Sequence, residues 1–191
     1  MTELLDEAQL GSFIDAHYRG RGDVLFRMER HPWYAVPQQA AELAAWRNGG
    51  ELDLAAKQPW LDVLADEVER GMLTQRVRIL SADLTEDERR ACHWGYPYVG
   101  RFEEIRVLRR SEHVIPDVRA DDYWIIRPAE GDVQVVRMDY GPEGIFSGAR
   151  MLPASEHGPY LLEQRLSWLA AEPFATWWAR HRELHRARPA A

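Results

Sequence analysis

Cysteine is almost missing from this sequence, because the only thiol among 191 residues is that of Cys92. A single cysteine excludes a disulfide within the chain and is typical of proteins from a reducing compartment. Long apolar runs are also missing, and no stretch approaches the roughly 20 residues of a membrane-spanning helix. Residues 1–7 are acidic and lack the basic and apolar regions of a secretory signal. The sequence therefore predicts a cytoplasmic protein with no membrane partner.

Positive charge is scarce as well. The 24 lysines and arginines are outnumbered by 31 aspartates and glutamates, which gives a net charge of −7. Non-specific attraction of the whole molecule to nucleic acid is therefore not expected, although a local basic patch can still bind phosphate.

Several functional signatures are missing from the sequence. It has no glycine-rich phosphate-binding loop, no Gly-x-Ser-x-Gly turn and no Cys-x-x-Cys pair. His181 and His185 have the spacing of two metal ligands on a helix, but no third ligand is evident. We therefore predict no cofactor and no metal site.

The composition is that of a globular protein, with 46% hydrophobic and 29% charged residues. A length of 191 residues fits one domain. The eight tryptophans are expected to lie mostly in the core, with a pocket wall as the alternative.

The strongest strand signals lie in residues 121–151, which contain three β-type runs separated by turn residues. Residues 75–81 and 102–109 also alternate between apolar and charged side chains, as half-buried strands do. Residues 23–29 alternate weakly and fit either a strand or a buried turn. The sequence thus predicts a mainly antiparallel sheet of about five strands.

Helical patterns flank the strands on both sides. The expected helices cover residues 2–18, residues 37–47, a segment from Gln58 to Gly71, a short helix after Thr85, and two helices that begin at Pro159 and Pro173. Their apolar stripes include Leu61, Leu64 and Val68, with Trp60 beside them, then Leu162, Leu166 and Leu169, and finally Phe174, Trp177 and Leu184. Residues 95–100 are expected to form a loop. The predicted fold is one α+β domain over residues 1–191, with an N-terminal helix and loop in residues 1–22 and C-terminal helices in residues 155–191.

Four arginines in the predicted strands form the main candidate binding site. If the strands pair as neighbours, Arg76, Arg78, Arg106 and Arg137 fall on the side opposite the apolar residues, where guanidinium groups can bind phosphate or carboxylate. The alternative is cross-strand pairing with Glu104 and Asp139 on an ordinary wet face.

Two further groups are candidates for chemistry. Cys92 and His93 are sequence neighbours, but side chains that follow each other on a helix point about 100° apart, so an inert thiol is the alternative. Tyr96 and Tyr98 form an aromatic segment that suits a pocket rim.

Carboxylates stand beside phenols at two predicted strand ends. They are the segments 121–123 and 139–140. A carboxylate at such a position can act as a general base or can cap a turn.

The order of these segments resembles an actinobacterial family of unknown function whose genes lie beside helix-turn-helix regulators. The matching residues are 25–29, 34–36, 60–61, 76–79, 104–108, 122–125, 135–140 and 148–149. This chain departs from the pattern in residues 92–99, which are longer and more aromatic. The resemblance implies an α+β fold and supplies no catalytic residues.

The chain is also similar to small transferases that move an aminoacyl group from tRNA to an acceptor in antibiotic pathways. That similarity implies aminoacyl-tRNA as a partner, with Asp139 and Tyr123 as catalytic residues. The substrate-binding residues would then be Arg76, Arg78, Arg106, Arg137, Trp124, Tyr96 and Tyr98. The alternative function is a non-catalytic partner of a helix-turn-helix DNA-binding protein, and the oligomeric state stays open.

Overall fold

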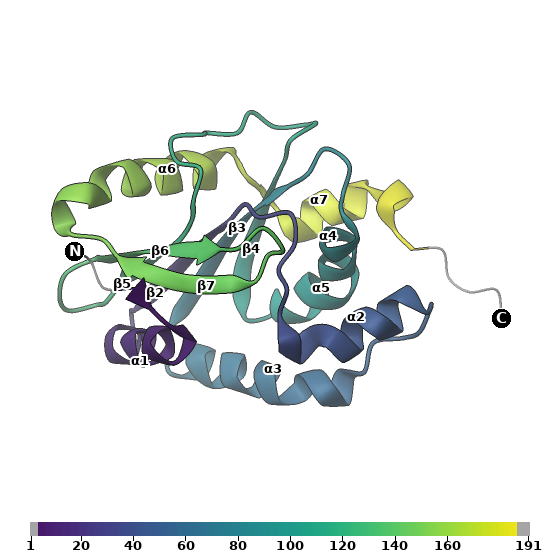
Figure 1. Ribbon diagram of the computed structural model, residues 1–191, viewed down its shortest axis with the longest axis horizontal. Coiled ribbons are helices and arrows are strands. Elements are labelled where there is room, and N and C mark those ends of the chain that lie inside the picture. Colours follow the sequence, from purple (N-terminus) through teal and green to yellow (C-terminus); the bar gives the residue numbers. More distant parts are fainter. Residues whose placement is uncertain (1–3, 187–191) are drawn as a thin grey trace.

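A mixed sheet of eight strands runs through the middle of the molecule in a computed structural model that describes residues 4–186, apart from the side chain of Gln38 (Figure 1). The strands are β1 (Leu4–Leu5), β2 (Val24–Glu29), β3 (Leu73–Leu80), β4 (Glu103–Arg109), β5 (Asp122–Arg127), β6 (Gln134–Tyr140), β7 (Phe146–Met151) and β8 (Glu172–Pro173). Their order across the sheet is β1-β7-β6-β5-β2-β3-β4-β8. Residues 1–3 and 187–191, which belong to the predicted N-terminal and C-terminal segments, lie outside the described part.

The prediction of about five mainly antiparallel strands is wrong in size and in character. β2 pairs with β3 in parallel, and β3 pairs with β4 in parallel, while the other neighbours are antiparallel. The weakly alternating segment 23–29 is the strand β2 near the centre, where both faces are covered and alternation is lost. β1 and β8 have two residues each, which is too short for a sequence pattern.

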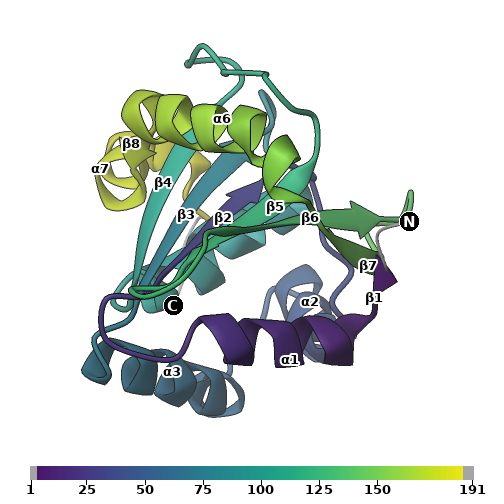
Figure 2. The ribbon, with the colours of Figure 1, turned by 90° about the vertical axis from the view of Figure 1, so that its left-hand side faces the viewer.

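Helices cover both faces of the sheet (Figure 2). They are α1 (Glu7–His17), α2 (Ala40–Arg47), α3 (Leu54–Glu69), α4 (Glu86–Arg90), α5 (Tyr96–Val99), α6 (His157–Ala170) and α7 (Phe174–Arg180). Shorter helical turns are η1 (Pro37–Gln39), η2 (Ala91–Gly95), η3 (Ala154–Glu156) and η4 (Arg182–Leu184). Helix α6 lies across one face, named the α6 face here, and α1 and α3 lie on the other, named the α3 face. Together these elements form a single α+β domain.

Each face has its own apolar core. On the α6 face, Phe26, Met28 and Val77 pack with Tyr123 and with Tyr160 from α6. On the α3 face, side chains from α3, β4 and α7 pack together, among them Leu64, Val107 and Trp177. Of the eight tryptophans only Trp94 and Trp177 are buried, so the expectation that most would be core is wrong.

Local signals place the start of α4 correctly and miss two other helical segments. Thr85 begins α4 with the predicted capping box, because its hydroxyl accepts from the Glu88 N–H and the Glu88 carboxylate accepts from the Thr85 N–H. Helix α3 starts earlier than predicted, at Leu54, because Asp53 caps it, and Pro59 lies inside the helix. Residues 95–100, predicted as a loop, are largely helical, since α4 continues through η2 into α5.

The orientation of α6 differs from the prediction. The predicted apolar stripe of Leu162, Leu166 and Leu169 faces outward, and the helix buries Glu163 and Ser167 instead. Periodicity identified the helix correctly, but it selected the wrong face. On α3, Leu61 and Leu64 are buried as predicted, whereas Trp60 and Val68 are exposed.

None of the helices within residues 4–186 combines the length and the apolar character that a membrane crossing requires.

A matched pair of leucines tests this arrangement. Leu64→Ala removes a side chain that is 1% exposed and should lower the free energy of unfolding by about 2–5 kcal/mol. Leu162→Ala removes a side chain that is 52% exposed and should change it by less than about 0.5 kcal/mol. Urea unfolding of both variants measures the difference. Equal costs would contradict the outward orientation of α6.

Candidate functional site

The four candidate arginines do not share a face of the sheet. Arg76 is level with Ile105 on β4, whereas Arg106 is level with Val77 on β3. Because side chains alternate between faces along a strand, Arg76 and Arg78 lie on the α3 face and Arg106 lies on the α6 face. Arg137 belongs to the α6 face too, since its register connects it through Tyr123 and Met28 to Val77. The predicted single arginine face is therefore wrong, because alternation within each strand does not reveal the register between strands.

The two arginines of the α3 face are held by buried carboxylates. Arg76 contacts Glu103 at 2.8 Å and Glu29 at 2.9 Å. Arg78 is 1% exposed, donates to the Tyr34 hydroxyl at 3.1 Å and lies 3.7 Å from Glu88. These guanidinium groups therefore neutralise buried carboxylates within the fold.

The two arginines of the α6 face are also engaged. Arg106 donates to the carbonyls of Trp168 and Ala171 and stacks over the Trp168 ring at 4.4 Å. Arg137 contacts Asp139 at 3.1 Å, and the same carboxylate accepts from Arg150 at 2.9 Å. A phosphate would have to displace these partners.

The aromatic candidates are scattered. Tyr123 is fully buried under α6, and its hydroxyl donates to the Tyr160 carbonyl at 3.3 Å. Trp124 lies on the opposite face beneath Arg27, at 5.0 Å. Tyr96 is buried in the core of the α3 face, and Tyr98 packs against that core. Of the predicted site residues, only Asp139 lies at the pocket described next.

A polar pocket of about 880 Å³ opens at the edge of the sheet where β2, β4 and β6 end and β5 begins. Its walls come from four segments of the chain. They are residues 30–32, Arg110, residues 117–122 and residues 138–140. The connection that follows β2 leads to the helices of the α3 face, and residues 110–121 after β4 pass beside α6 (Figures 1 and 2). Ligands often bind outside the carboxyl ends of parallel strands, at a position where connections leave toward opposite faces of the sheet.

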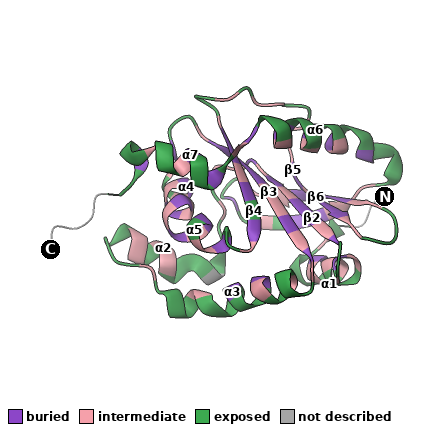
Figure 3. Cartoon of the chain, turned by 180° about the vertical axis from the view of Figure 1, so that it is seen from behind, coloured by how far each residue is buried: buried purple, intermediate pink, exposed green. Residues whose placement is uncertain are grey.

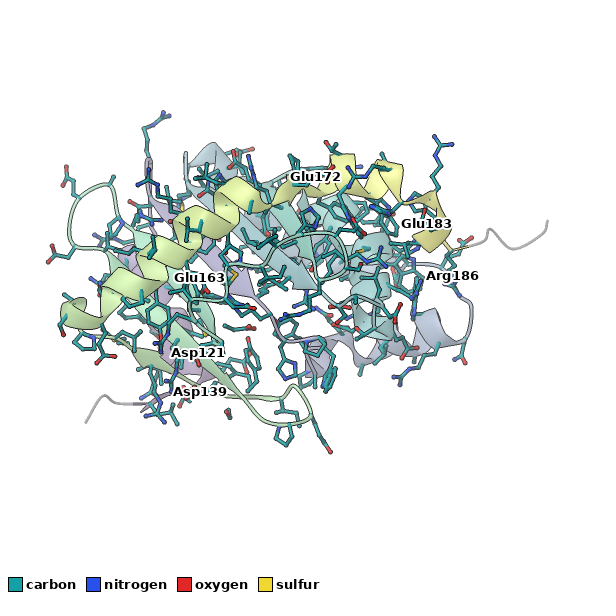
Figure 4. The ribbon with its side chains drawn as sticks, turned by 90° about the horizontal axis from the view of Figure 1, so that it is seen from above. Asp121, Asp139, Glu163, Glu172, Glu183 and Arg186 are labelled. Carbon is teal, nitrogen blue, oxygen red and sulfur yellow. The ribbon has the colours of Figure 1, made fainter. Side chains whose placement is uncertain are left out.

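Both signs of charge line the pocket. Three arginines, at positions 30, 110 and 119, face aspartates 117, 121, 122 and 139. Figure 4 shows Asp121 and Asp139 near each other, on one side of α6. Such a lining suits a small polar molecule with separated positive and negative groups.

Side-chain contacts from α6 hold one wall of the pocket in place. Arg30 is buried and contacts Glu163 at 2.5 Å and Asp117 at 2.9 Å. The same Glu163 oxygen accepts from the backbone N–H groups of Val118 and Arg119, both at 2.8 Å. A single buried carboxylate thus holds the loop that forms the wall.

Asp122 connects the pocket to the buried charges under the sheet. One carboxylate oxygen accepts from the Arg30 N–H at 2.7 Å, and the other accepts from the Tyr34 hydroxyl at 2.5 Å. The Tyr34 oxygen in turn accepts from Arg78, which pairs with Glu88. A hydrogen-bonded chain therefore runs from the pocket to the centre of the α3 face.

Burial raises the pKa of Asp122 above its ordinary value, although the hydrogen bonds from Tyr34 and Arg30 oppose the shift. Burial also raises the pKa of the Tyr34 hydroxyl. A carboxyl group with a raised pKa at the wall of an open pocket is a candidate proton acceptor or donor.

Two other candidates from the sequence are not arranged for catalysis or metal binding. Cys92 is fully buried, and burial raises the pKa of its thiol to about 12, which keeps it protonated and unreactive. His181 contacts Glu112 at 3.0 Å and Glu183 at 2.8 Å, and His185 stacks on Trp178. Within residues 4–186 no group of three or more metal-ligating side chains is close enough to hold an ion.

The fold and the site define a class of protein. It is a single α+β domain with a mixed sheet and a polar pocket at the strand ends. The chain belongs to the family described as a domain of unknown function (DUF6879), whose model matches residues 13–179. Neither the curated proteins nor the solved structures contain a significant match to it.

Only part of this site could be predicted from the sequence. The acidic pair at 121 and 122 stood out beside Tyr123, but Arg30 and Tyr34 lie in segments without regular periodicity. Arg30 reaches the pocket and Tyr34 reaches Asp122 because β2 ends beside the start of β5, and that long-range pairing joins residues about ninety positions apart.

The raised pKa of Asp122 predicts a pH-dependent stability. Because its pKa is higher in the folded than in the unfolded chain, its contribution to stability is fully present below the unfolded pKa and is lost as the pH rises through the folded pKa. Asp122→Asn cannot ionise, so its stability relative to the natural chain should improve as the pH rises from about 3.5 to about 7. Urea unfolding across this range measures the difference.

Glu103→Gln is a useful comparison because it should show the opposite slope. Burial acts to raise the pKa of Glu103, but the charges of Arg76 and Arg27 outweigh it and the pKa is lowered. The stabilising contribution of Glu103 is therefore present above the unfolded pKa and is lost as the pH falls through the folded pKa. Parallel slopes for the two variants would contradict the assignment.

Proposed function

We propose that this protein is an aminoacyl-tRNA-dependent transferase that moves the aminoacyl group to a small acceptor in the pocket, with Asp122 as the proton acceptor. The observation that supports this most is the buried carboxyl of Asp122, which has a raised pKa and lies at the wall of a pocket with both signs of charge. The reaction is the one that we expect from the sequence resemblance to transferases of antibiotic pathways.

The reaction needs little besides positioning and proton transfer. The acceptor amine attacks the carbonyl carbon of the aminoacyl ester, the carbon–oxygen bond to the ribose breaks, and an amide forms. The proton released by the amine passes to Asp122, and the ribose oxygen leaves as a hydroxyl after taking up a proton. A positioned carboxyl group typically contributes about 10²–10⁴-fold to such a step.

Different parts of the lining suit different parts of the donor. The α-ammonium group of the aminoacyl ester fits beside Asp121 and Asp139, which are half-buried at the wall. Arg110 is exposed and Arg119 is half-exposed at the mouth, where they can contact the phosphates of the tRNA acceptor end. In this proposal they take the phosphate-binding role first expected of Arg76, Arg78, Arg106 and Arg137. Arg119 would exchange its contacts with Asp121 at 3.4 Å and Tyr160 at 3.1 Å for the phosphate.

Binding of aminoacyl-tRNA and of deacylated tRNA at two salt concentrations tests the donor. We expect the aminoacylated tRNA to bind more tightly than the deacylated tRNA. The double variant Arg110→Ala/Arg119→Ala should bind more weakly, with a salt slope that is lower by about 0.7–0.9 for each lost phosphate contact. Arg101→Ala removes an exposed arginine just before β4, at the opposite end of that strand from the pocket, and is the matched control. Equal binding of the two tRNA forms would remove the proposal.

Asp122→Asn tests the proton acceptor separately. It should lower the rate of single-turnover transfer by about 10²–10⁴-fold while aminoacyl-tRNA binding persists, since the amide keeps the shape of the side chain. An unchanged rate would exclude Asp122 as the base.

The second candidate function is a non-catalytic partner of a helix-turn-helix regulator. The observation that favours it is the surface of α3, where Trp60 and Val63 are exposed at i, i+3 spacing and Leu54 and Val68 are exposed nearer the two ends of the helix. An apolar surface of this kind often marks a protein interface.

That candidate predicts that a helix-turn-helix protein is encoded beside this chain and forms a stable complex with it. Co-purification at micromolar concentration should succeed with the natural chain and fail with Trp60→Glu/Val63→Glu. Leu162→Glu places the same charge on the other side of the molecule and should leave the complex intact.

A further inference from the structure

The outward side of α6 is the most unusual surface of the protein. Leu162, Leu166 and Leu169 are 52%, 40% and 72% exposed, while Glu163 and Ser167 on the same helix are fully buried. Figure 3 shows the exposed side of α6 as a nearly continuous band. Hydrophobic side chains at positions i, i+4 and i+7 normally form the buried stripe of a helix.

The inward side of α6 explains why the leucines point outward. Glu163 accepts from the N–H groups of Val118 and Arg119 and pairs with Arg30, so the helix cannot rotate without leaving a buried charge unpaired. Unpairing a buried ion pair costs about 3–5 kcal/mol. The outward position of the leucines is therefore fixed by the fold.

Two valines in the loop beside α6 are exposed as well. Val118 is 40% exposed and its backbone is bonded to Glu163, and Val114 is 88% exposed four residues earlier in the same loop. The outer leucine surface is defined here as Leu162, Leu166 and Leu169 of α6 together with Val114 and Val118.

We propose that a second copy of this chain covers the outer leucine surface, with the two α6 helices packed antiparallel about a twofold axis near Leu166. A twofold axis brings the same patch of both copies together, so the patch has to complement itself. Leu162 and Leu169 lie on either side of Leu166 along the helix, and an antiparallel pair therefore stacks leucine against leucine.

Charge favours a second copy at this face. Each copy carries a net charge of −7, so two copies repel each other over most of their surfaces. The exposed residues of α6 include only one charged side chain, that of Arg165. This face therefore carries none of the excess negative charge of the chain.

The size of the surface sets the expected affinity. The 14 residues of α6 span about 21 Å, so the helix alone covers less than the ~800 Å² per partner of a standard interface. The valines of the adjacent loop enlarge it. We expect a dimer with a dissociation constant on the order of micromolar.

Sedimentation velocity between ~1 and ~200 µM tests the dimer, because a micromolar association gives a mass that rises over this range. The natural chain should change from monomer to dimer. Leu166→Glu should stay monomeric at all concentrations, and Val63→Glu, which adds the same charge to an exposed site on α3, should dimerise like the natural chain. Unchanged far-ultraviolet circular dichroism and urea unfolding show that Leu166→Glu still folds.

Cross-linking identifies the face. A short bismaleimide should join two copies of Leu166→Cys and should not join two copies of Val63→Cys. The natural Cys92 does not interfere, because it is fully buried and its thiol stays protonated. A natural chain that is monomeric at the highest concentration overturns the proposal. So does a dimer that persists in Leu166→Glu, or equal cross-linking of the two cysteine variants.

Discussion

Every buried charge in this protein requires a partner, and this requirement determines how the loops and helices are arranged around the sheet. Glu163 is the clearest case, because one carboxylate binds Arg30 after β2 and two backbone N–H groups of the loop before β5. Arg78 and Glu88 do the same on the other face, where they anchor the start of the helical run 86–99 under β3. Replacing one member of such a pair leaves a charge in a medium that solvates it poorly. The pairs therefore restrict the pocket wall, α6 and the helices of the α3 face to one arrangement.

Part of this structure could be predicted from the sequence. Alternation identified the strands β3 and β4, and three β-type runs separated by turn residues identified β5 to β7. Capping chemistry identified the start of α4, and all these signals are local. The register between strands is not local, so the sequence placed Arg106 on the same face as Arg78 when the parallel pairing puts them on opposite faces. β2 was ambiguous for another reason, because a central strand that is covered on both faces loses its alternation. The orientation of α6 was predicted wrongly because a buried ion pair outweighs an apolar stripe when the two compete.

Sequence signals were also insufficient to select the reactive carboxylate of the candidate site. Asp139 was selected because it stands beside a phenol, and it does reach the pocket, but it lies between Arg137 and Arg150. Asp122 differs because burial raises its pKa and its partner Tyr34 comes from a segment that no periodicity marks. Burial and long-range hydrogen bonds distinguish two aspartates that look alike in the sequence. Membership of a family of unknown function supplies no residue roles, so these physical differences carry the assignment.

The loop of residues 110–121 belongs to two surfaces at once. Asp117, Arg119 and Asp121 line the pocket, Val114 belongs to the outer leucine surface, and Val118 takes part in both. Glu163 fastens this loop through two backbone N–H groups, so any displacement of the loop moves residues of both surfaces. If a ligand in the pocket and a second copy favour different positions of the loop, the two binding events have a coupling free energy, and linkage makes that coupling reciprocal. Each would then change the apparent affinity of the other by the same factor.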